Sequence, residues 1–548
     1  MTTGNPSEAR STVAGLFRLP GFSKRNLPRE LLAGITLMTI AVPLNIGYAQ
    51  IAGLPPSAGL YALIIPTVVY ALVVSSRQVV ASPDAAAAAL VASSLGGLAA
   101  AGSDAYLAMA LAQAIICGVV MLLMSVFRLG FLAAFLSEPI LVGFISGLAL
   151  EVLVSQIAKM LGIHLDPGGE FVSKVIDLVA GIPHANIWAV SIAAVSLVVL
   201  LGPRRKLPRV PWPLVVLVAA TVVVASTDLT DRGVSVLGEI PSGPPVFTWP
   251  QLGWLDWIAL VPSALALAMV ATVEGLLIAR SYAERHGYPV SPDRDLAAFG
   301  LSNVAAGLTG GFAIGSSTSR TAAMEEAGSR SQLPSLVMAL TTLALLLCGT
   351  GLLADIPSAA IGAIISVAVV PLLGVSRFVE LWRLERFEFG IAVVCFGVTV
   401  LVGPIPGILV AVVLAFMNLA RRVATPAIEV RRLGGAQGPD GVTIVRMSGP
   451  LFFANADVFA RTLKSVACDG SDSVRSLLID MGEVTDVDVT AAESFQHLRS
   501  WLVGRGIDLA FARPRGAQLL RLRRLGVIRV DDRVFATVQE AEAALRGG

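Results

Sequence analysis

Long apolar stretches separated by short polar breaks fill the chain between Leu31 and Leu419. A helix needs about 20 mainly apolar residues to cross the hydrocarbon core of a bilayer. The apolar runs between Gly, Pro and charged breaks predict fourteen membrane segments, at 29–50, 57–75, 83–97, 105–127, 132–161, 175–202, 211–226, 256–280, 294–309, 318–330, 332–353, 356–374, 388–402 and 405–422. We therefore expect an α-helical polytopic membrane protein.

The third segment of each half differs from its neighbours in the same way. Both are short, rich in small residues and opened by Ser, Gly or Pro, in VVASPDAAAAALVASS and GGFAIGSSTSRTAAM. Short or interrupted segments at matching positions of two halves are typical of transporters built from inverted repeats, whose half-helix N-termini meet near the middle of the membrane. The pattern predicts 14 transmembrane segments as 7+7 inverted repeats.

After Pro426 the apolar positions begin to alternate with polar ones. The stretches GVTIVRMSGPLFFANADVF and VRSLLIDMGEVTDVDVTAAESFQHLRSWLVGRGIDLAFAR predict short strands alternating with helices, which is typical of an α/β unit with parallel strands. The expected organisation is an N-terminal segment at 1–28, a membrane domain at 29–424, a linker at 425–439 and a soluble domain at 440–548.

Composition excludes an ordinary soluble protein. Hydrophobic residues make up 55% of the chain and charged residues 14%, whereas soluble domains carry roughly a quarter charged residues. The net charge is +2 and the basic residues form short clusters beside the apolar segments, so no nucleic-acid partner is expected. The cysteines and histidines have no disulfide or metal-ligand spacing, and no nucleophile–base arrangement is present, so we predict no metal, no cofactor and no enzyme activity.

The distribution of Lys and Arg predicts the orientation in the membrane. Loops on the cytoplasmic side of a membrane protein are enriched in these residues. With the N-terminus inside, the internal segment ends carry Arg18, Lys24, Arg25, Arg29, Arg128, Arg204, Arg205, Lys206, Arg209, Arg280, Arg285, Arg330, Arg377, Arg383, Arg386, Arg421 and Arg422, and the external loops carry little beyond Arg232. We expect a multi-pass protein of the cell membrane with both the N-terminus and the soluble domain in the cytoplasm.

The starts of the two half-helices are the candidate site for a small anion. A helix N-terminus carries about half a positive charge and several unpaired N–H groups, so two such ends facing one cavity attract an anion. Arg320 adds a full charge at membrane depth, either for the substrate or for a structural pair with a carboxylate. The predicted substrate-binding residues are Tyr48, Ser82, Pro83, Asp84, Ala85, Ser317, Thr318, Ser319 and Arg320.

Three acidic residues in the membrane domain need separate interpretations. Glu274 lies deep in an apolar segment and is the natural partner of Arg320, either as a structural pair or as a group that couples transport to protons. Asp84 is expected to cap the first half-helix. Because an ionised carboxylate there repels an anion, the alternatives are that Asp84 faces away from the cavity or holds a proton. Glu151 and Lys159 share one helix face and are expected to be an internal pair or interface residues, not site residues.

These features resemble the SulP family, the sulfate permease group of solute carriers, over most of the chain. The motifs are AVPLNIGYAQIAGLPPSAGLY, VEGLLIARSYA and DRDLAAFGLSNVAAGLTGGFAIGSSTSRTAAMEEAGSRSQL. The resemblance implies fourteen helices in core and gate domains, a homodimer, and an anion held between the third and tenth helices beside a Ser-Arg pair, which matches Ser319 and Arg320. Proton-coupled members carry a glutamate that matches Glu274.

Two departures from the family pattern concern the substrate. Leu44 follows Pro43 where many members have Gln, and Ser82-Pro83-Asp84 stands where the third helix often opens with Gly-Pro. Sulfate, bicarbonate, chloride and C4-dicarboxylates therefore remain open as substrates.

The soluble domain resembles a STAS domain, with the signature loop at 480–492. Thr490 occupies the position that is phosphorylated in related antagonists of anti-sigma factors, and its structural alternative is an N-cap for the next helix.

The favoured function is a proton-coupled anion symporter. The alternatives are a nucleobase permease of the same architecture, an anion exchanger, an anion channel or voltage-responsive motor, and an anion sensor that acts through the STAS domain.

Overall fold

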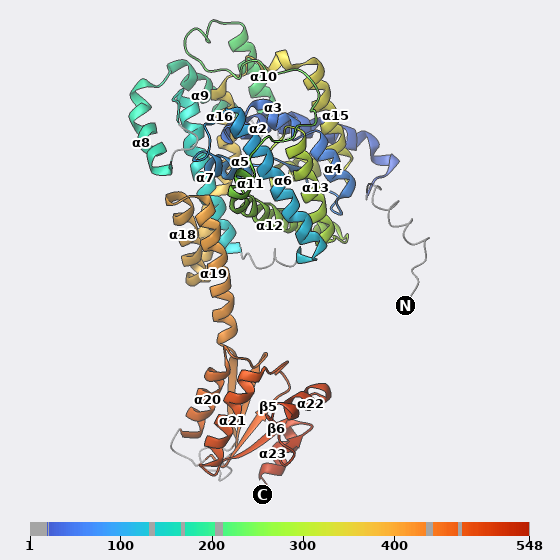
Figure 1. Ribbon diagram of the computed structural model, residues 1–548, viewed down its shortest axis with the longest axis vertical. Helices are drawn as coiled ribbons and strands as arrows, with labels where there is room; N and C mark the ends of the chain where they lie inside the picture. Colours follow the sequence, from blue (N-terminus) through green and yellow to red (C-terminus); the bar gives the residue numbers. More distant parts are fainter. Residues whose placement is uncertain are drawn as a thin grey trace. The chain divides into compact units, whose positions relative to one another are not determined.

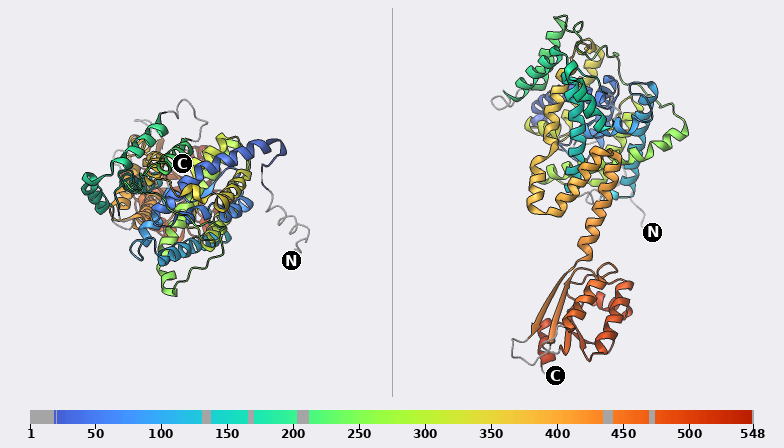
Figure 2. Two further views of the ribbon diagram at one scale, coloured as in Figure 1. Left: turned by 90° about the horizontal axis from the view of Figure 1, so that it is seen from above. Right: turned by 90° about the vertical axis from the view of Figure 1, so that its left-hand side faces the viewer.

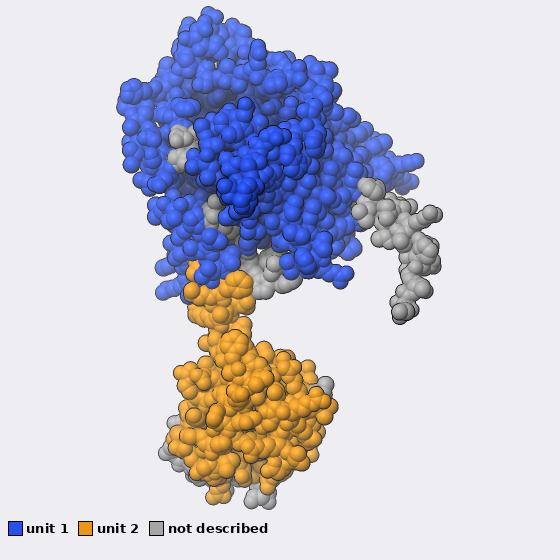
Figure 3. Space-filling model, in the orientation of Figure 1, with its two compact units in different colours: residues 1–413 blue, residues 414–548 orange. Residues whose placement is uncertain are grey.

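The structure is a computed structural model that describes residue 19 and residues 21–130, 138–165, 170–202, 212–433, 442–468 and 474–546. The chain divides into two compact units, residues 1–413 and 414–548 (Figure 3), which we describe separately. Several predicted features lie outside the described residues: the N-terminal segment up to residue 18, the basic cluster at 204–209, and residues 434–439 of the predicted linker.

The first unit is a helical bundle (Figures 1 and 2). Its first half contains η1 (Lys24–Asn26), α2 (Leu27–Ile51), α3 (Pro56–Tyr61), α4 (Ile65–Val73), α5 (Ala85–Leu95), α6 (Asp104–Val126), α7 (Glu138–Leu161), α8 (Phe171–Gly181), η3 (Ile182–His184), α9 (Ile187–Leu201) and α10 (Trp212–Ala225). Its second half contains α11 (Trp254–Ala259), α12 (Val261–His286), α13 (Pro292–Leu308), α14 (Thr318–Glu326), α15 (Leu333–Cys348), η5 (Thr350–Leu353), α16 (Ser358–Val369), η6 (Val370–Leu373), α17 (Val375–Leu384), α18 (Arg386–Leu401) and the first part of α19 (Pro404–Ala424), which continues into the second unit.

Length and composition identify the helices that can cross a membrane. In the described part of the chain, six helical stretches are long and apolar enough, or seven if the bent pair α8–α9 is one span. Helices α5, α10 and α15 are shorter apolar helices. Most predicted segments coincide with a helix, and the total of fourteen spans remains a prediction.

One predicted segment is wrong, and one helix was not predicted. The segment at 175–202 is not one helix, because α8 and α9 meet at an angle of 109°. Pro183 occupies the break, and the Asn186 side chain accepts hydrogen bonds from the backbone N–H groups of Trp188 and Ala189, so a new helix starts there. Residues 375–384, between the predicted segments at 356–374 and 388–402, form helix α17, which the apolar pattern did not predict.

Small residues allow the helices of the bundle to approach closely. Helices α6 and α13 pack against each other, and a Cβ atom placed on Gly118 would lie 2.5 Å from the carbonyl oxygen of Gly300. Such contacts between small residues are a common basis of helix packing in membranes, where apolar burial alone gives little preference for one neighbour.

The second unit is a five-stranded sheet covered by helices on both faces. The strands lie in the order β3 (Ala427–Leu433), β4 (Val442–Ser448), β5 (Ser476–Asp480), β6 (Asp508–Ala512) and β7 (Arg533–Phe535). The β3–β4 pair is antiparallel and the other pairs are parallel, as predicted for the central strands. The helices are α20 (Ala456–Cys468), α21 (Val489–Val503), α22 (Gly516–Arg524) and α23 (Val538–Arg546).

Alternation along β5 separates the two faces of this sheet. Leu477 and Ile479 belong to the larger core formed with α20, α21 and α22, whereas Leu478 packs in a smaller core with Ala541 of α23. Residues 427–433, which the sequence predicts as part of a linker, form β3 and pair with β4 along their whole length. The soluble sheet therefore begins earlier in the chain than the pattern after Pro426 indicated.

Candidate functional site

Two short helices begin side by side in the first unit, one in each half of the chain. Strand β1 (Ala81–Ser82) precedes α5, and β2 (Gly315–Ser316) precedes α14. The two strands pair antiparallel, with Ser82 opposite Gly315, and the Ser317 N–H donates to the Val80 carbonyl at 3.1 Å. Because each helix starts directly after its strand, the two N-termini lie next to each other, as the half-helix pattern predicts.

Side chains from the chain itself cap both helix starts. Asp84 caps α5, and its Oδ1 accepts from the Ala87 N–H at 2.7 Å. Ser317 caps α14, and its hydroxyl accepts from the Arg320 N–H at 3.4 Å. The capping interpretation of Asp84 is therefore correct.

Arg320 is fully buried within the first turn of α14. Its Nη2 donates to the carbonyl oxygen of Pro83, so the guanidinium reaches from one half-helix to the residue before the other. The N–H groups on Nε and Nη1 have no hydrogen-bond partner in the described part of the protein. Burying unsatisfied donors is costly, and more so on a charged group, so this arrangement is suited to accept an anionic ligand.

Tyr48 of α2 lies beside this arginine. The Cζ atom of Arg320 is 5.7 Å from the centre of the Tyr48 ring, within the range of a cation–π contact. Tyr48 is itself buried, so an apolar ring covers one side of the guanidinium without neutralising its charge.

Asp84 and Gly315 are in contact across the two strands. A Cβ atom at Gly315 would collide with Oδ2 of Asp84, so only glycine leaves room for the carboxylate there. Arg320 and Asp84 are close enough to attract each other electrostatically. The Asp84 carboxylate therefore lies beside both helix starts and does not face away from the candidate site.

Glu274 lies on α12, which packs against α5 and β2. The predicted pairing with Arg320 is wrong: within the described residues, Glu274 forms no ion pair or hydrogen bond, while Arg320 bonds to Pro83. The electrostatic neighbour of Glu274 is instead Asp84, which repels it. Two carboxylates and one guanidinium thus share this region.

The other predicted residues divide by exposure. Ser82, Ala85 and Ser317 are buried, and the Ser82 hydroxyl has no hydrogen-bond partner among the described residues. Thr318 and Ser319, in the first turn of α14, are exposed. The structure thus brings all the predicted substrate-binding residues to one place, with Arg320 at its buried end.

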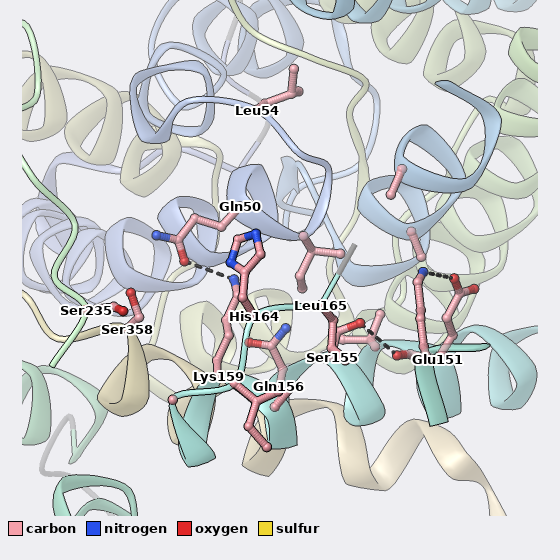
Figure 4. Close-up of a pocket in the computed structure, with 18 residues that line it drawn as sticks. Gln50, Leu54, Glu151, Ser155, Gln156, Lys159, His164, Leu165, Ser235 and Ser358 are labelled. Carbon is pink, nitrogen blue, oxygen red and sulfur yellow. Dashed lines mark hydrogen bonds and ion pairs between the residues drawn. The ribbon is translucent and has the colours of Figure 1, made fainter. Parts of the chain in front are cut away.

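A separate polar cavity, which the sequence did not predict, borders the same bundle. It has a volume of about 360 Å³ and is lined by parts of α2, α5, α7 and α8 (Figure 4). Its polar lining consists of Gln50, Glu151, Ser155, Gln156, Lys159, His164, Lys174, Ser235 and Ser358. The available signal was the spacing of polar residues on α7, where Glu151, Ser155 and Lys159 are four residues apart and share one face.

The predicted Glu151–Lys159 pair is not formed. Glu151 accepts from Lys174 of α8 at 2.9 Å, and the Lys159 ammonium donates to Oε1 of Gln50 on α2 at 3.1 Å. Eight residues along a helix correspond to a rise of about 12 Å, so each side chain finds a nearer partner on another helix.

In the second unit, Thr490 is exposed in the first turn of α21. It does not cap this helix, because Asp488 is the N-cap and its Oδ1 accepts from the Ala491 N–H at 2.7 Å. The N-cap alternative for Thr490 is therefore wrong, since Asp at the preceding cap position provides the bond.

The carboxyl end of β5 carries an ion-pair cluster around the buried Asp480 carboxylate. The Asp480 carboxylate accepts from Arg446 at 2.9 Å and from the Nε of Arg513 at 2.9 Å. Burial raises the pKa of the Asp480 carboxyl, but hydrogen bonds from Arg513, the Gly482 N–H and Arg446 outweigh it, and the pKa lies below its usual value. This cluster joins β4, β5 and the end of β6 at the start of the signature loop.

The chain joins a membrane-type helical bundle to an α/β domain. In the bundle, two discontinuous helices start beside a buried arginine. This arrangement is typical of the class of secondary membrane transporters. A family model described as the sulfate permease family matches residues 27–395, and the STAS domain model matches residues 435–541.

Known proteins agree with this assignment. A probable sulfate transporter of Mycobacterium tuberculosis is 35% identical, with 97% of this chain and 98% of the relative covered. Probable sulfate transporter 3.3 of Arabidopsis thaliana is 27% identical, with 96% of this chain and 89% of the relative covered.

Two solved structures share the fold. The murine solute carrier 26 family member A9 anion transporter has a TM-score of 0.88 at 24% identity and covers 100% of this chain and 96% of its own. The transmembrane domain of the cyanobacterium bicarbonate transporter BicA has a TM-score of 0.65 at 22% identity, covering 71% of this chain and 99% of its own.

The chain belongs to the sulfate permease family and carries a STAS domain, as the motifs of the sequence indicate. It is a multi-pass membrane transporter.

Proposed function

We propose that this protein is a proton-coupled symporter of a small anion, which binds between the N-termini of α5 and α14. One observation carries this proposal: Arg320 is fully buried, and its N–H donors on Nε and Nη1 have no hydrogen-bond partner among the described residues. A bound anion satisfies those donors and receives the partial positive charge of two helix starts.

Proton coupling follows from the charges around this arginine. Asp84 and Glu274 provide two negative charges against one positive charge, so the region is negative when both carboxylates are ionised. An anion entering it is repelled unless protons bind as well. With one proton the cluster is neutral, and with two it attracts the anion. Anion and protons therefore bind together and move together.

Alternating access is the transport mechanism that this arrangement favours. The binding region is formed by two half-helices and α2, and rigid-body movement of one repeat against the other can expose such a region to either side in turn. We propose fourteen spans in two inverted repeats, with core and gate domains.

Sulfate is the first substrate to test, because both relatives named above are described as probable sulfate transporters. Bicarbonate, chloride and C4-dicarboxylates follow, because Leu44 and Asp84 alter the family pattern at the site.

We further propose a cell-membrane location with the N-terminus and the STAS domain in the cytoplasm, a homodimeric assembly, and Thr490 as a phosphorylation site that regulates transport.

The test is uptake of labelled sulfate, bicarbonate, chloride and fumarate into proteoliposomes, with and without an inward proton gradient. For the transported anion, the gradient should drive accumulation in the wild type and in the control Glu284→Gln, whose carboxylate is exposed and paired with Arg280. Glu274→Gln should lose the accumulation. Undiminished pH-driven uptake by Glu274→Gln would refute the coupling role of this residue.

The same experiment separates the alternatives. An exchanger requires an anion on the opposite side, a channel gives conductive flux without accumulation, and a sensor binds the anion without flux.

A further inference from the structure

The cavity between α2, α5, α7 and α8 has a charge that its own residues do not balance. Lys174 and Glu151 form an ion pair at 2.9 Å, and both side chains are nearly buried, so these two charges cancel. Lys159 donates a hydrogen bond to the neutral Gln50 amide oxygen at 3.1 Å and forms no ion pair with any described residue. Among the described residues that line the cavity, Lys159 is therefore a cation without a compensating carboxylate.

Gln156 is a second, independent sign of a ligand at this position. Its side chain is fully buried and lines the cavity, yet both its Oε1 and its Nε2 lack a hydrogen-bond partner among the described residues. Leaving a buried amide unsatisfied costs about 1–3 kcal/mol for each group, so such a side chain is normally paired. Gln50, Lys159 and Gln156 lie on the same side of the cavity, away from Glu151 (Figure 4).

We propose that this cavity is a second anion site, which binds a small oxyanion through the Lys159 ammonium and the Gln156 amide. An ammonium offers three donors, of which Gln50 takes one, and an amide offers two more. Donors without a competing carboxylate match an oxyanion such as sulfate or bicarbonate, whereas a cation is repelled by Lys159. Glu151 does not compete for the anion because Lys174 neutralises it.

The position of the cavity indicates what such a site does. It borders α5 at Ala89 and Ala92, one to two turns beyond Asp84, and α2 at Gln50, close to Tyr48. In the orientation predicted from Lys and Arg, the C-terminal ends of α2, α5 and α7 face the outside. The second site therefore binds an external anion before the anion reaches Arg320. Binding at this site raises the anion concentration near Arg320.

The test measures anion binding to the purified full-length protein when the Arg320 site is disabled. Titrations with sulfate, bicarbonate and fumarate at constant ionic strength use Arg320→Gln as the parent. At least one of the anions should still bind to this parent. Adding Lys159→Gln should weaken that remaining binding at least tenfold, as should Gln156→Leu. Lys159→Arg should preserve it, because it keeps the charge. The matched control Lys464→Gln removes a lysine from α20 of the STAS domain and should have no effect.

Two results overturn this proposal. One is that the Arg320→Gln protein binds none of the three anions although the wild type binds at least one, which leaves the proposed function intact. The other is that Lys159→Gln binds as tightly as its parent. If Arg320→Gln loses transport but still binds an anion at the Lys159 and Gln156 site, the result supports both proposals. Melting temperatures verify that each variant is folded.

Discussion

Replacing Arg320 by Gln should reduce anion uptake by about 10²–10⁴-fold at low substrate concentration. The Arg320 donors on Nε and Nη1 have no hydrogen-bond partner among the described residues, and we expect at least one hydrogen bond from each to the anion. A hydrogen bond from a charged donor contributes about 1.5–3 kcal/mol, so two contribute about 3–6 kcal/mol. Since about 1.4 kcal/mol corresponds to a factor of ten, the loss spans two to four orders of magnitude.

The assay is the initial rate of uptake into proteoliposomes, with sulfate, bicarbonate or fumarate as the probe, whichever the wild type transports. At low concentration this rate is proportional to kcat/KM, which measures stabilisation of the rate-limiting state relative to the free transporter and anion. Arg320→Lys keeps the charge but not the planar set of donors, so its rate should lie between those of the wild type and Arg320→Gln.

The matched control is Arg377→Gln on α17, where the arginine is half exposed and bonds to Glu380 at 2.9 Å. It should transport normally. If Arg320→Gln also transports within threefold of the wild type, the buried guanidinium does not bind the anion, and the proposed site is refuted.

Two further predictions concern packing and the soluble domain. Gly315→Ala forces the Asp84 carboxylate to move, which should cost about 1–3 kcal/mol of stability, lower the melting temperature and slow transport. The control Gly351→Ala places its methyl group in open space and should change neither the melting temperature nor the transport rate. Equal melting temperatures of the two variants would contradict the packing argument. Asp480→Ala removes the carboxylate that Arg446 and Arg513 share, and leaves Arg446 only its longer contact with Glu429 at 3.8 Å. This change should destabilise the STAS sheet by about 3 kcal/mol, the lower end for a buried pair, because both arginines are more than a third exposed. Because the folded pKa of Asp480 is lowered, its stabilisation should be complete above the unfolded pKa of about 3.9 and decline as the pH falls towards the folded value. Hydrogen exchange of β5 and β6, corrected for its intrinsic pH dependence, measures both the loss of stability in Asp480→Ala and the decline at low pH. Equal protection in Asp480→Ala and the wild type at neutral pH would exclude a stabilising role for Asp480.

Much of the membrane unit follows from local pattern. The apolar length of α2, α6, α7 and α12 and the small-residue stretches that open α5 and α14 are properties of short windows of sequence, so these elements are predictable without coordinates. The Ser-Pro-Asp and Ser-Ser-Thr starts also identify the candidate site, because helix capping depends on residues within one turn. In the soluble domain, alternation predicts β4, β5 and β6 for the same reason.

Pairings between distant segments did not follow from the pattern. The sequence favours Glu274 as the partner of Arg320 and Lys159 as the partner of Glu151, whereas the structure pairs Arg320 with the Pro83 carbonyl and Glu151 with Lys174. Strand β3 was also hidden, since its charged residues obscure the alternation and only its pairing with β4 makes it a strand.

The sequence by itself determined a polytopic helical transporter with two broken helices, a membrane-depth arginine and an α/β tail. These depend on hydrophobic length and on contacts within a turn, which the order of residues specifies directly. The tertiary structure alone decided which charges meet, that Asp84 lies against Gly315, and that Lys159 and Gln156 line one cavity. Electrostatic and hydrogen-bond partners depend on distances of a few ångströms between segments far apart in the chain, and only the packing of the helices sets those distances.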